Sequence, residues 1–188
     1  MENYKKNLEL LTKNHVYSKE MEHDACGVGL IASTEGKKSR AIVEYGIEAL
    51  KAVWHRGAVD ADGKTGDGAG IHVEIPKDFF IEKIQVTGHD YDNSEICVGM
   101  IFLPRNDYSA QESCKTIVES ELTKNNFSIY GWRQVPVNPK VLGEKALQTM
   151  PEIIQVLFKS NDQNLLDKNL ERKIYETRKR IENKAFEA

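Results

Sequence analysis

The sequence has no long hydrophobic run and no excess of positive charge. None of its apolar stretches approaches the roughly 18 residues that cross a bilayer. Residues 1–11 mix charged and apolar side chains and lack the continuous apolar segment of a secretory signal. The 26 Lys and Arg residues against 29 Asp and Glu residues give a net charge of −3, which provides no basic surface for nucleic acid. We therefore expect neither a membrane protein, nor an exported protein, nor a nucleic-acid-binding protein.

Cysteine is also scarce. The three cysteines are Cys26, Cys97 and Cys114, and they form no Cys-x-x-Cys pair of the kind found in zinc or thioredoxin-like sites. An odd number of widely spaced cysteines is typical of the reducing cytoplasm, so we expect a cytoplasmic protein without a bound metal ion. Cys97 and Cys114 lie in apolar segments, where packing in a core explains them.

The remaining composition is that of a globular protein. A chain of 188 residues with 40% hydrophobic and 29% charged residues fits one domain, or a piece of a larger one. Apolar runs predict strands at 26–33, 71–75, 96–103, 127–135 and 153–158. Helical spacing of apolar residues predicts helices at 41–55, 109–124 and from about 165 onward. Because several strands follow one another through short turns, we expect a layered α+β fold with a largely antiparallel sheet.

The abrupt change of composition near Cys26 is the most informative feature. Residues 1–23 are polar and charged, and a strand rich in small residues opens directly at Cys26. Peptide cleavage before Cys26 would leave one residue with both a thiol and a free α-amine, whose reference pKa values are about 8.5 and about 7.7–8.0. That residue could then hold a nucleophile and its own general base. Gly27 and Gly29 would leave room for a substrate carbonyl beside the sulfur.

Two other interpretations of Cys26 remain open. It could be an ordinary buried thiol in a glycine-containing strand, since free cysteine behaves as a small hydrophobic residue. It could also belong to a metal site with His23 and Asp24, and with His55 as a further ligand. The spacing is poor for structural zinc, which usually draws pairs of ligands separated by two to four residues.

Arg56 and the glycine-rich segment 65–70 form a second candidate site. Arg56 could line a pocket for an acidic group, with the glycines letting backbone N–H groups point inward. The alternative is a helix end followed by a solvent-exposed loop. The glycine-rich segment lacks the Gly-Lys-Ser/Thr ending of a phosphate-binding loop.

Residues 131–138 could form an aromatic and basic binding strip. Packing of Trp132 in the core explains this segment as well.

Taken together, four blocks of sequence resemble the amino-terminal glutaminase domain of glutamate synthase large subunits, a class II amidotransferase of the N-terminal-nucleophile type. The blocks occur in the same order as in that family, and the resemblance extends from about Asp24 to the end of the chain. They are Asp24–Gly29, His55–Ala58, Thr65–Ile71 together with Ile75–Phe80, and Gly131–Pro136.

The resemblance implies a domain organisation and a fold. Residues 1–25 would be a pro-segment, and 26–188 would be the amino-terminal part of the amidotransferase domain, incomplete at its carboxyl end. The fold would be a four-layer αββα sandwich of which only the first part is present. Cys26 would be the catalytic nucleophile, and Arg56 would support its surroundings. The family's later motifs, which hold the glutamine carboxylate and form the oxyanion hole, do not occur here and are expected beyond Ala188.

The resemblance also implies a substrate, cofactors and partners. The domain would hydrolyse L-glutamine to glutamate and ammonia, and the ammonia would serve the reductive synthesis of glutamate from 2-oxoglutarate. No cofactor is expected in this segment, whereas FMN and a 3Fe-4S cluster are expected elsewhere in the full-length large subunit. The partners would be the rest of that subunit and either a small NAD(P)H-dependent flavoprotein subunit or ferredoxin. Alternatives are another class II amidotransferase, or a catalytically inert fragment or interaction module.

Overall fold

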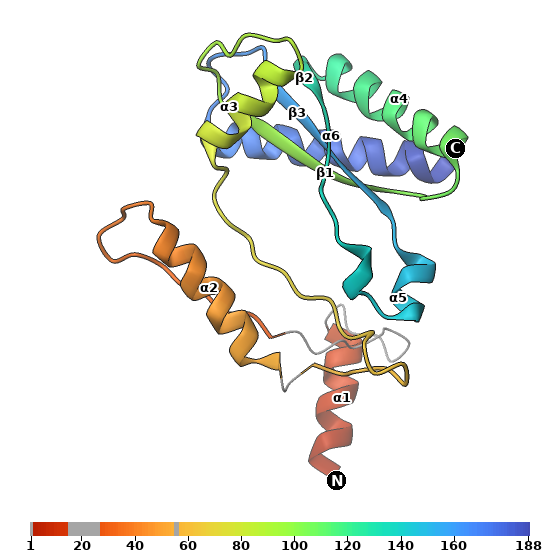
Figure 1. Ribbon diagram of the computed structural model, residues 1–188. Coiled ribbons are helices and arrows are strands. Elements are labelled where there is room, and N and C mark those ends of the chain that lie inside the picture. The colour runs from red at the N-terminus through yellow and green to blue at the C-terminus, as the bar shows by residue number, and fades with distance from the viewer. Residues whose placement is uncertain (1, 15–26, 55–56) are drawn as a thin grey trace. The chain divides into compact units, whose positions relative to one another are not determined.

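The computed structural model describes residues 2–14, 27–54 and 57–188 and divides the chain into two units, Met1–Ala52 and Val53–Ala188 (Figure 1). The first unit contains helices α1 (Glu2–Asn14) and α2 (Arg40–Ala52). None of the helices in the described ranges is long and apolar enough to span a bilayer.

Helix α2 confirms the helix predicted at 41–55, but it ends at Ala52, earlier than predicted. Val43, Ile47 and Leu50 recur at helical spacing, and all three are half-buried. On the solvent-exposed side of this helix, Nε of Arg40 lies 3.2 Å from Oε1 of Glu44, an ion pair that joins consecutive turns.

The predicted strand at 26–33 is wrong for its described part. Residues 27–33 form no strand, and the side chains of Val28 and Leu30 are 94% and 91% exposed. The predicted strand at 71–75 is absent as well, and Ile71, Val73 and Ile75 remain partly exposed. Alternation or clustering of apolar residues predicts which face of a strand is buried, but a strand exists only where a neighbour pairs with it. Neither segment has such a neighbour in the described part of the chain.

The second unit is built on a three-stranded antiparallel sheet with the strand order β1-β3-β2, which confirms the predicted sheet type. The predicted strands near 96, 127 and 153 and the predicted helices near 109 and 165 are all present. The elements are α3 (Lys77–Val86), β1 (Cys97–Leu103), α4 (Tyr108–Lys124), β2 (Phe127–Gln134), the 3₁₀ helix η2 (Pro139–Val141), α5 (Glu144–Thr149), β3 (Glu152–Ser160) and α6 (Asp167–Glu187).

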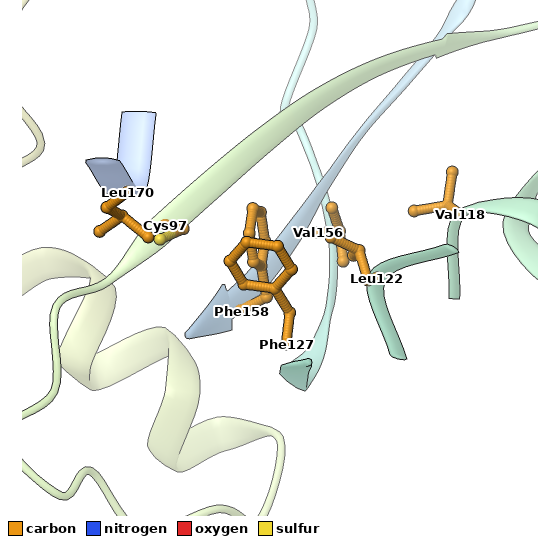
Figure 2. Packing of buried hydrophobic residues seen from close by; sticks show 7 residues of the cluster. All are labelled: Cys97, Val118, Leu122, Phe127, Val156, Phe158 and Leu170. Atoms are coloured by element: carbon orange, nitrogen blue, oxygen red, sulfur yellow. The ribbon is translucent and has the colours of Figure 1, made fainter. Parts of the chain in front are cut away.

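Apolar residues cover both faces of this sheet. On one face, side chains from α4 and α6 pack against the strands, and the rings of Phe127 and Phe158 meet edge to face at 5.3 Å (Figure 2). Cys97 belongs to this cluster and is 5% exposed, which confirms that it packs in a core. On the other face, Phe80 and Ile84 of α3 pack with neighbouring residues of the sheet.

The ends and the outer sides of the helices follow local sequence signals. Asp107 caps α4 by accepting a hydrogen bond of 2.9 Å from the backbone N–H of Ala110. The basic run near Arg178 lies on the solvent side of α6 and pairs with Glu182 of the same helix.

Helix α3 was not predicted from the sequence. Two signals for it were present, namely Pro76 before its first residue and the i, i+4 spacing of Phe80 and Ile84.

A β-bulge in β2 brings Ile129 and Trp132, which are three positions apart, to the same face of the sheet. The register shifts between Ile129 and Gly131, so Tyr130 is the extra residue. Ile129 and Trp132 therefore pack on the α4 and α6 side, while Tyr130 packs with α3. Gly131 has φ +147°, and a Cβ there would lie 2.7 Å from Cγ2 of Thr87.

Replacing Gly131 by alanine is expected to lower the free energy of unfolding by about 1–3 kcal/mol, because it adds a backbone strain and a steric clash. Urea denaturation followed by circular dichroism measures the change. Gly46→Ala is the matched control, because no atom lies within 4 Å of a Cβ at Gly46 and its helical backbone favours alanine. Equal stability of the two variants would contradict this assignment of strain to Gly131.

Candidate active site

The predicted nucleophile Cys26 and the predicted supporting residue Arg56 lie outside the residues that the structure describes. The same holds for His23, Asp24 and His55 of the alternative metal site. Within the described residues that follow Cys26, a Cβ built at Gly27 or Gly29 would meet no atom within 4 Å. No close contact therefore requires glycine at these positions, and their role in admitting a substrate stays a prediction.

The structure joins two of the sequence blocks that carry the family resemblance. Directly after Arg56, the backbone N–H of Ala58 donates a 2.9 Å hydrogen bond to Oδ2 of Asp67, and the N–H of Asp67 donates to the carbonyl of Ala58 at 3.3 Å. An isolated antiparallel bridge joins Val59 to Gly66. A Cβ at Gly66 would lie 3.1 Å from the Ala58 carbonyl oxygen, so the close approach favours glycine there. The chain that follows Arg56 is thus paired with the glycine-rich block.

The carboxylate of Asp62 organises the tip of this loop. It accepts hydrogen bonds from the backbone N–H groups of Lys64 at 2.9 Å and Thr65 at 2.7 Å, and from the Thr65 hydroxyl at 2.5 Å. These bonds, of which the Thr65 hydroxyl's is the strongest, hold the pKa of the Asp62 carboxyl well below its usual range. Gly63, which lies between Asp62 and Lys64 at the tip of the loop, has φ +68°, a conformation that glycine adopts without strain.

The same loop docks on the start of α5. The residue before α5 is Gly143, which has no side chain to cap the helix. Instead, Asp62 accepts from the backbone N–H of Lys145 at 3.5 Å and Thr65 accepts from that of Ala146 at 3.4 Å. Lys145 also pairs with Asp60 at 2.6 Å. Residues about eighty positions earlier therefore satisfy the first N–H groups of this short helix.

The second part of the glycine-rich block, Ile75–Phe80, meets the block Gly131–Pro136 at the sheet. The guanidinium of Arg133 lies 5.1 Å from the ring centre of Phe79, which belongs to the block Ile75–Phe80. Arg133 also donates a 2.7 Å hydrogen bond to Oε1 of Gln155 on β3. The indole N–H of Trp132 donates to Glu119 of α4 at 2.7 Å. These internal contacts support the packing interpretation of residues 131–138 over that of an open binding strip.

A polar cluster that the sequence interpretation missed lies beside the bulge. Tyr130 is 4% exposed and donates a 2.9 Å hydrogen bond to Asp92, which also pairs with Lys159. The bond from Lys159 is the main cause of a pKa of Asp92 well below its usual range, and burial, followed by the bond to Asp92, raises the pKa of Tyr130 above its usual range. Only the tertiary fold brings these three residues together, so no local pattern could have revealed the cluster.

The Asp92 cluster predicts a pH dependence of stability. Because folding lowers the pKa of Asp92, its contribution is complete above the unfolded-state value of about 3.9 and is lost as the pH falls below it toward the folded-state pKa. We expect Asp92→Asn to lower the free energy of unfolding at pH 7 by about 0.5–1 kcal/mol, a small value because Asp92 is partly exposed. The difference from the unsubstituted chain should shrink as the pH falls below about 3.9. Urea denaturation at several pH values measures both effects.

Asp90→Asn is the control for this experiment, since it removes the same charge from an exposed neighbouring position. A loss of stability that is equal in the two variants at pH 7 would show that the net charge, and not the contacts of Asp92, is responsible.

The described cysteines do not fit a metal or cluster site. Burial is the main cause that raises the pKa of Cys97 to about 12, and the nearby charges of Glu95 and Glu171 add to it. The other described cysteine, Cys114, is partly buried in α4. In the described part of the chain, no group of three or more His, Cys, Asp and Glu residues could hold a metal ion. Iron–sulfur clusters are held by several cysteine thiolates, so these residues do not fit a 3Fe-4S cluster.

Comparisons with known proteins agree with the resemblance. Residues 26–188 match the family described as "Glutamine amidotransferases class-II". The "Glutamate synthase [NADPH] large chain" of Azospirillum brasilense is 52% identical over 179 residues, which are 95% of this chain and 12% of that protein. The "Ferredoxin-dependent glutamate synthase" of Pyropia yezoensis is 40% identical over 174 residues, or 92% of this chain and 11% of that protein. The chain thus spans only about a tenth of the length of these relatives, and it belongs to the class II glutamine amidotransferases.

Proposed function

We propose that this chain is the amino-terminal part of the glutaminase domain of a glutamate synthase large subunit. The main support is the family match, which begins at Cys26, the residue that the sequence alone marks as a potential N-terminal nucleophile. Residues 1–25 would then be a pro-segment, and 26–188 the first part of the catalytic domain. The order of the sequence blocks and the identity of 52% to a glutamate synthase large chain favour this family member over another class II amidotransferase.

The proposed reaction needs few groups from this segment. After cleavage before Cys26, the free α-amine takes the thiol proton and the sulfur attacks the side-chain carbonyl carbon of glutamine. The C–N bond breaks, the α-ammonium returns the proton to the leaving nitrogen, and ammonia departs. Water then hydrolyses the glutamyl thioester, which releases glutamate and restores the thiol. Donors for the oxyanion and for the glutamine carboxylate would come from chain beyond Ala188, and their contribution to the rate is large.

The loop that follows Arg56 supports the role proposed for this residue. Residues 57–58 follow Arg56 directly, and the hydrogen bonds between Ala58 and Asp67 hold them against the glycine-rich block. The Asp62 contacts in turn anchor this loop to α5. A rigid support of this kind is what a residue needs if it is to present a fixed positive charge near the nucleophile.

The proposal extends to the fold and to the rest of the protein. The β1-β3-β2 sheet with α4 and α6 on one face would be one helix-covered half of an αββα sandwich, and a second sheet would pack against the part of the other face that α3 leaves open. FMN and a 3Fe-4S cluster would lie in the remainder of the large subunit, where ammonia would enter glutamate synthesis from 2-oxoglutarate. The electron donor would be a small NAD(P)H-dependent flavoprotein subunit or ferredoxin, and relatives of both kinds match this chain.

Labelling with the glutamine analogue 6-diazo-5-oxo-norleucine tests the proposed nucleophile. In a full-length large subunit that contains this sequence, we expect a single adduct on Cys26, and mass spectrometry should place Cys26 at the mature N-terminus. Cys97 should stay unlabelled, because at pH 8 a thiol with a pKa of about 12 has only about one thiolate in 10⁴.

Three results would contradict the proposal. They are labelling of Cys97 or Cys114 in place of Cys26, no labelling at any cysteine, and full activity of an enzyme that still begins at Met1 or Glu2. Cys114→Ser is the matched control, since it removes a cysteine that the proposed mechanism does not use.

A further inference from the structure

The two edges of the sheet differ in how they are protected. The outer edge of β2 is interrupted by the bulge at Tyr130, and the hydroxyl of Thr87 lies 2.7 Å from the carbonyl oxygen of Tyr130. Strand β1, at the other edge, reads Cys-Val-Gly-Met-Ile-Phe-Leu, without a charge or a proline. An uncharged apolar edge strand of seven residues is a site where another strand pairs.

The register identifies the backbone groups that are free at this edge. The backbone N–H of Val135 donates to the carbonyl of Ile153, so Ile153 directs its backbone groups toward β2. Because this direction alternates along a strand, Ile154 directs its backbone groups toward β1, where its partner is Ile101. The residues of β1 that bond to β3 are therefore Cys97, Gly99, Ile101 and Leu103. The residues whose N–H and C=O groups point away from β3 are Val98, Met100 and Phe102.

The side chains beside this edge are also uncovered. Met100 is 50% exposed and Phe102 is 63% exposed, whereas Val98 on the same face packs against the α3 cluster. In the described part of the chain, no strand other than β3 pairs with β1. Unpaired backbone groups and exposed apolar side chains thus coincide at the second half of β1.

The order of the elements indicates what fills this edge. Apart from η2 and α5, which lie between β2 and β3, the chain from Cys97 onward runs β1, α4, β2, β3, α6, with β3 between β1 and β2 in the sheet. This order corresponds to the first five elements of the split β-α-β arrangement βαββαβ. The sixth element of that arrangement is a strand that follows the second helix and pairs with β1. No element described here fills that position.

The geometry of α6 fits such a continuation. Leu170, near its start, packs in the same cluster as Cys97 at the beginning of β1 (Figure 2). The helix has 21 residues and is about 31 Å long, close to the roughly 30 Å of the nine-residue strand β3. It runs back across the sheet toward the end at which β1 finishes (Figure 1). A strand that starts there and pairs with β1 runs antiparallel to it.

We infer that the free edge of β1 accepts a fourth, antiparallel strand from the same polypeptide, which pairs with Val98, Met100 and Phe102. The inference rests on the proposed function, since it assumes that this chain is part of a longer glutamate synthase subunit. Its matches to the two relatives cover only 12% and 11% of their length, which is consistent with this assumption. The strand carries apolar residues on both faces, because one face joins the core under α4 and α6 and the other covers Met100 and Phe102. The pairing completes a four-stranded sheet.

Hydrogen exchange at single-amide resolution tests this inference on the 188-residue chain and on the full-length subunit. In the shorter chain, the amides of Gly99 and Ile101 should exchange slowly and those of Met100 and Phe102 quickly. In the full-length subunit, exchange at Met100 and Phe102 should slow by at least about 100-fold, while Gly99 and Ile101 serve as internal controls.

Two outcomes would overturn the inference. One is fast exchange at Met100 and Phe102 in both proteins. The other is slow exchange at both residues in the 188-residue chain, with a dimer in light scattering, which would make a second copy the occupant. Labelling of Cys26 by the glutamine analogue is scored separately, so a catalytic subunit with an unpaired β1 edge would reject this inference and leave the proposed function intact.

A pair of proline substitutions provides a second readout. Met100→Pro removes an N–H that points to the free edge, and Ile101→Pro removes one that bonds to β3. In the 188-residue chain, Ile101→Pro should lower the urea midpoint much more than Met100→Pro. In the full-length subunit the two should lower it by similar amounts, and a persistent difference between them would count against a fourth strand.

Discussion

Replacement of Cys26 by alanine is expected to lower glutamine hydrolysis by the full-length subunit by at least about 10⁴-fold, because the reaction loses the sulfur that forms the thioester. The rate of glutamate release from glutamine in a coupled assay measures the loss. Ammonia-dependent glutamate synthesis by the same variant should persist, since free ammonia bypasses the glutaminase step.

Two variants make this result specific. Cys114→Ala should retain glutaminase activity within about twofold, because Cys114 lies on a helix of the packed second unit and takes no part in the proposed chemistry. Cys26→Ser keeps a hydroxyl at the same position but has a much weaker nucleophile, so it should resemble Cys26→Ala in rate. Glutamine hydrolysis that survives either substitution at Cys26 would reject the covalent mechanism.

Replacement of Leu157 by alanine is expected to lower the free energy of unfolding of the 188-residue chain by about 3–5 kcal/mol. Leu157 is fully buried in the central strand β3, where it packs with Phe80 and Ile84 of α3 and with Tyr130 of β2. Truncation removes buried methyl groups and leaves a cavity between α3 and the sheet. Urea denaturation followed by far-UV circular dichroism measures the loss.

Leu166→Ala is the matched control, because it makes the same chemical change at a position that is 55% exposed. It should change the free energy of unfolding by less than about 1 kcal/mol. If the two variants were equally stable, the close packing of α3 on the sheet would be wrong.

Much of the second unit could be predicted because its signals are local. The apolar runs of β1 and β3 and the helical spacing in α4 and α6 specify both the element and its buried face. The segments 27–33 and 71–75 carry similar apolar patterns, yet they form no strand. The difference is not in the patterns but in the neighbours, since β1 and β2 both pair with β3 while these two segments have no strand beside them in the described residues.

The candidate site was predictable in part. Local sequence features and the family resemblance both marked Cys26, Arg56 and the glycine-rich block, and the roles of Cys26 and Arg56 stay predictions. Neither source indicated which blocks touch. The pairing of Ala58 with Asp67 depends on a turn formed by Asp60 to Thr65, for which the aspartates and glycines are a local signal. The docking of that turn on α5 joins residues about eighty positions apart, and no periodicity or spacing in one sequence contains such information.

The contact between this turn and Gly143 links the evolutionary histories of two distant stretches of the chain. A Cβ at position 143 would overlap Asp62 and Thr65, so any larger residue there becomes acceptable only after the turn has changed. Shortening the Thr65 side chain would not be sufficient, because Asp62 and the backbone nitrogen of Thr65, 2.5 Å from that Cβ, would still be in the way. A larger residue at position 143 should therefore appear in descendants of this sequence only together with a changed path of the turn, and its effect on stability should depart strongly from additivity with substitutions in that turn.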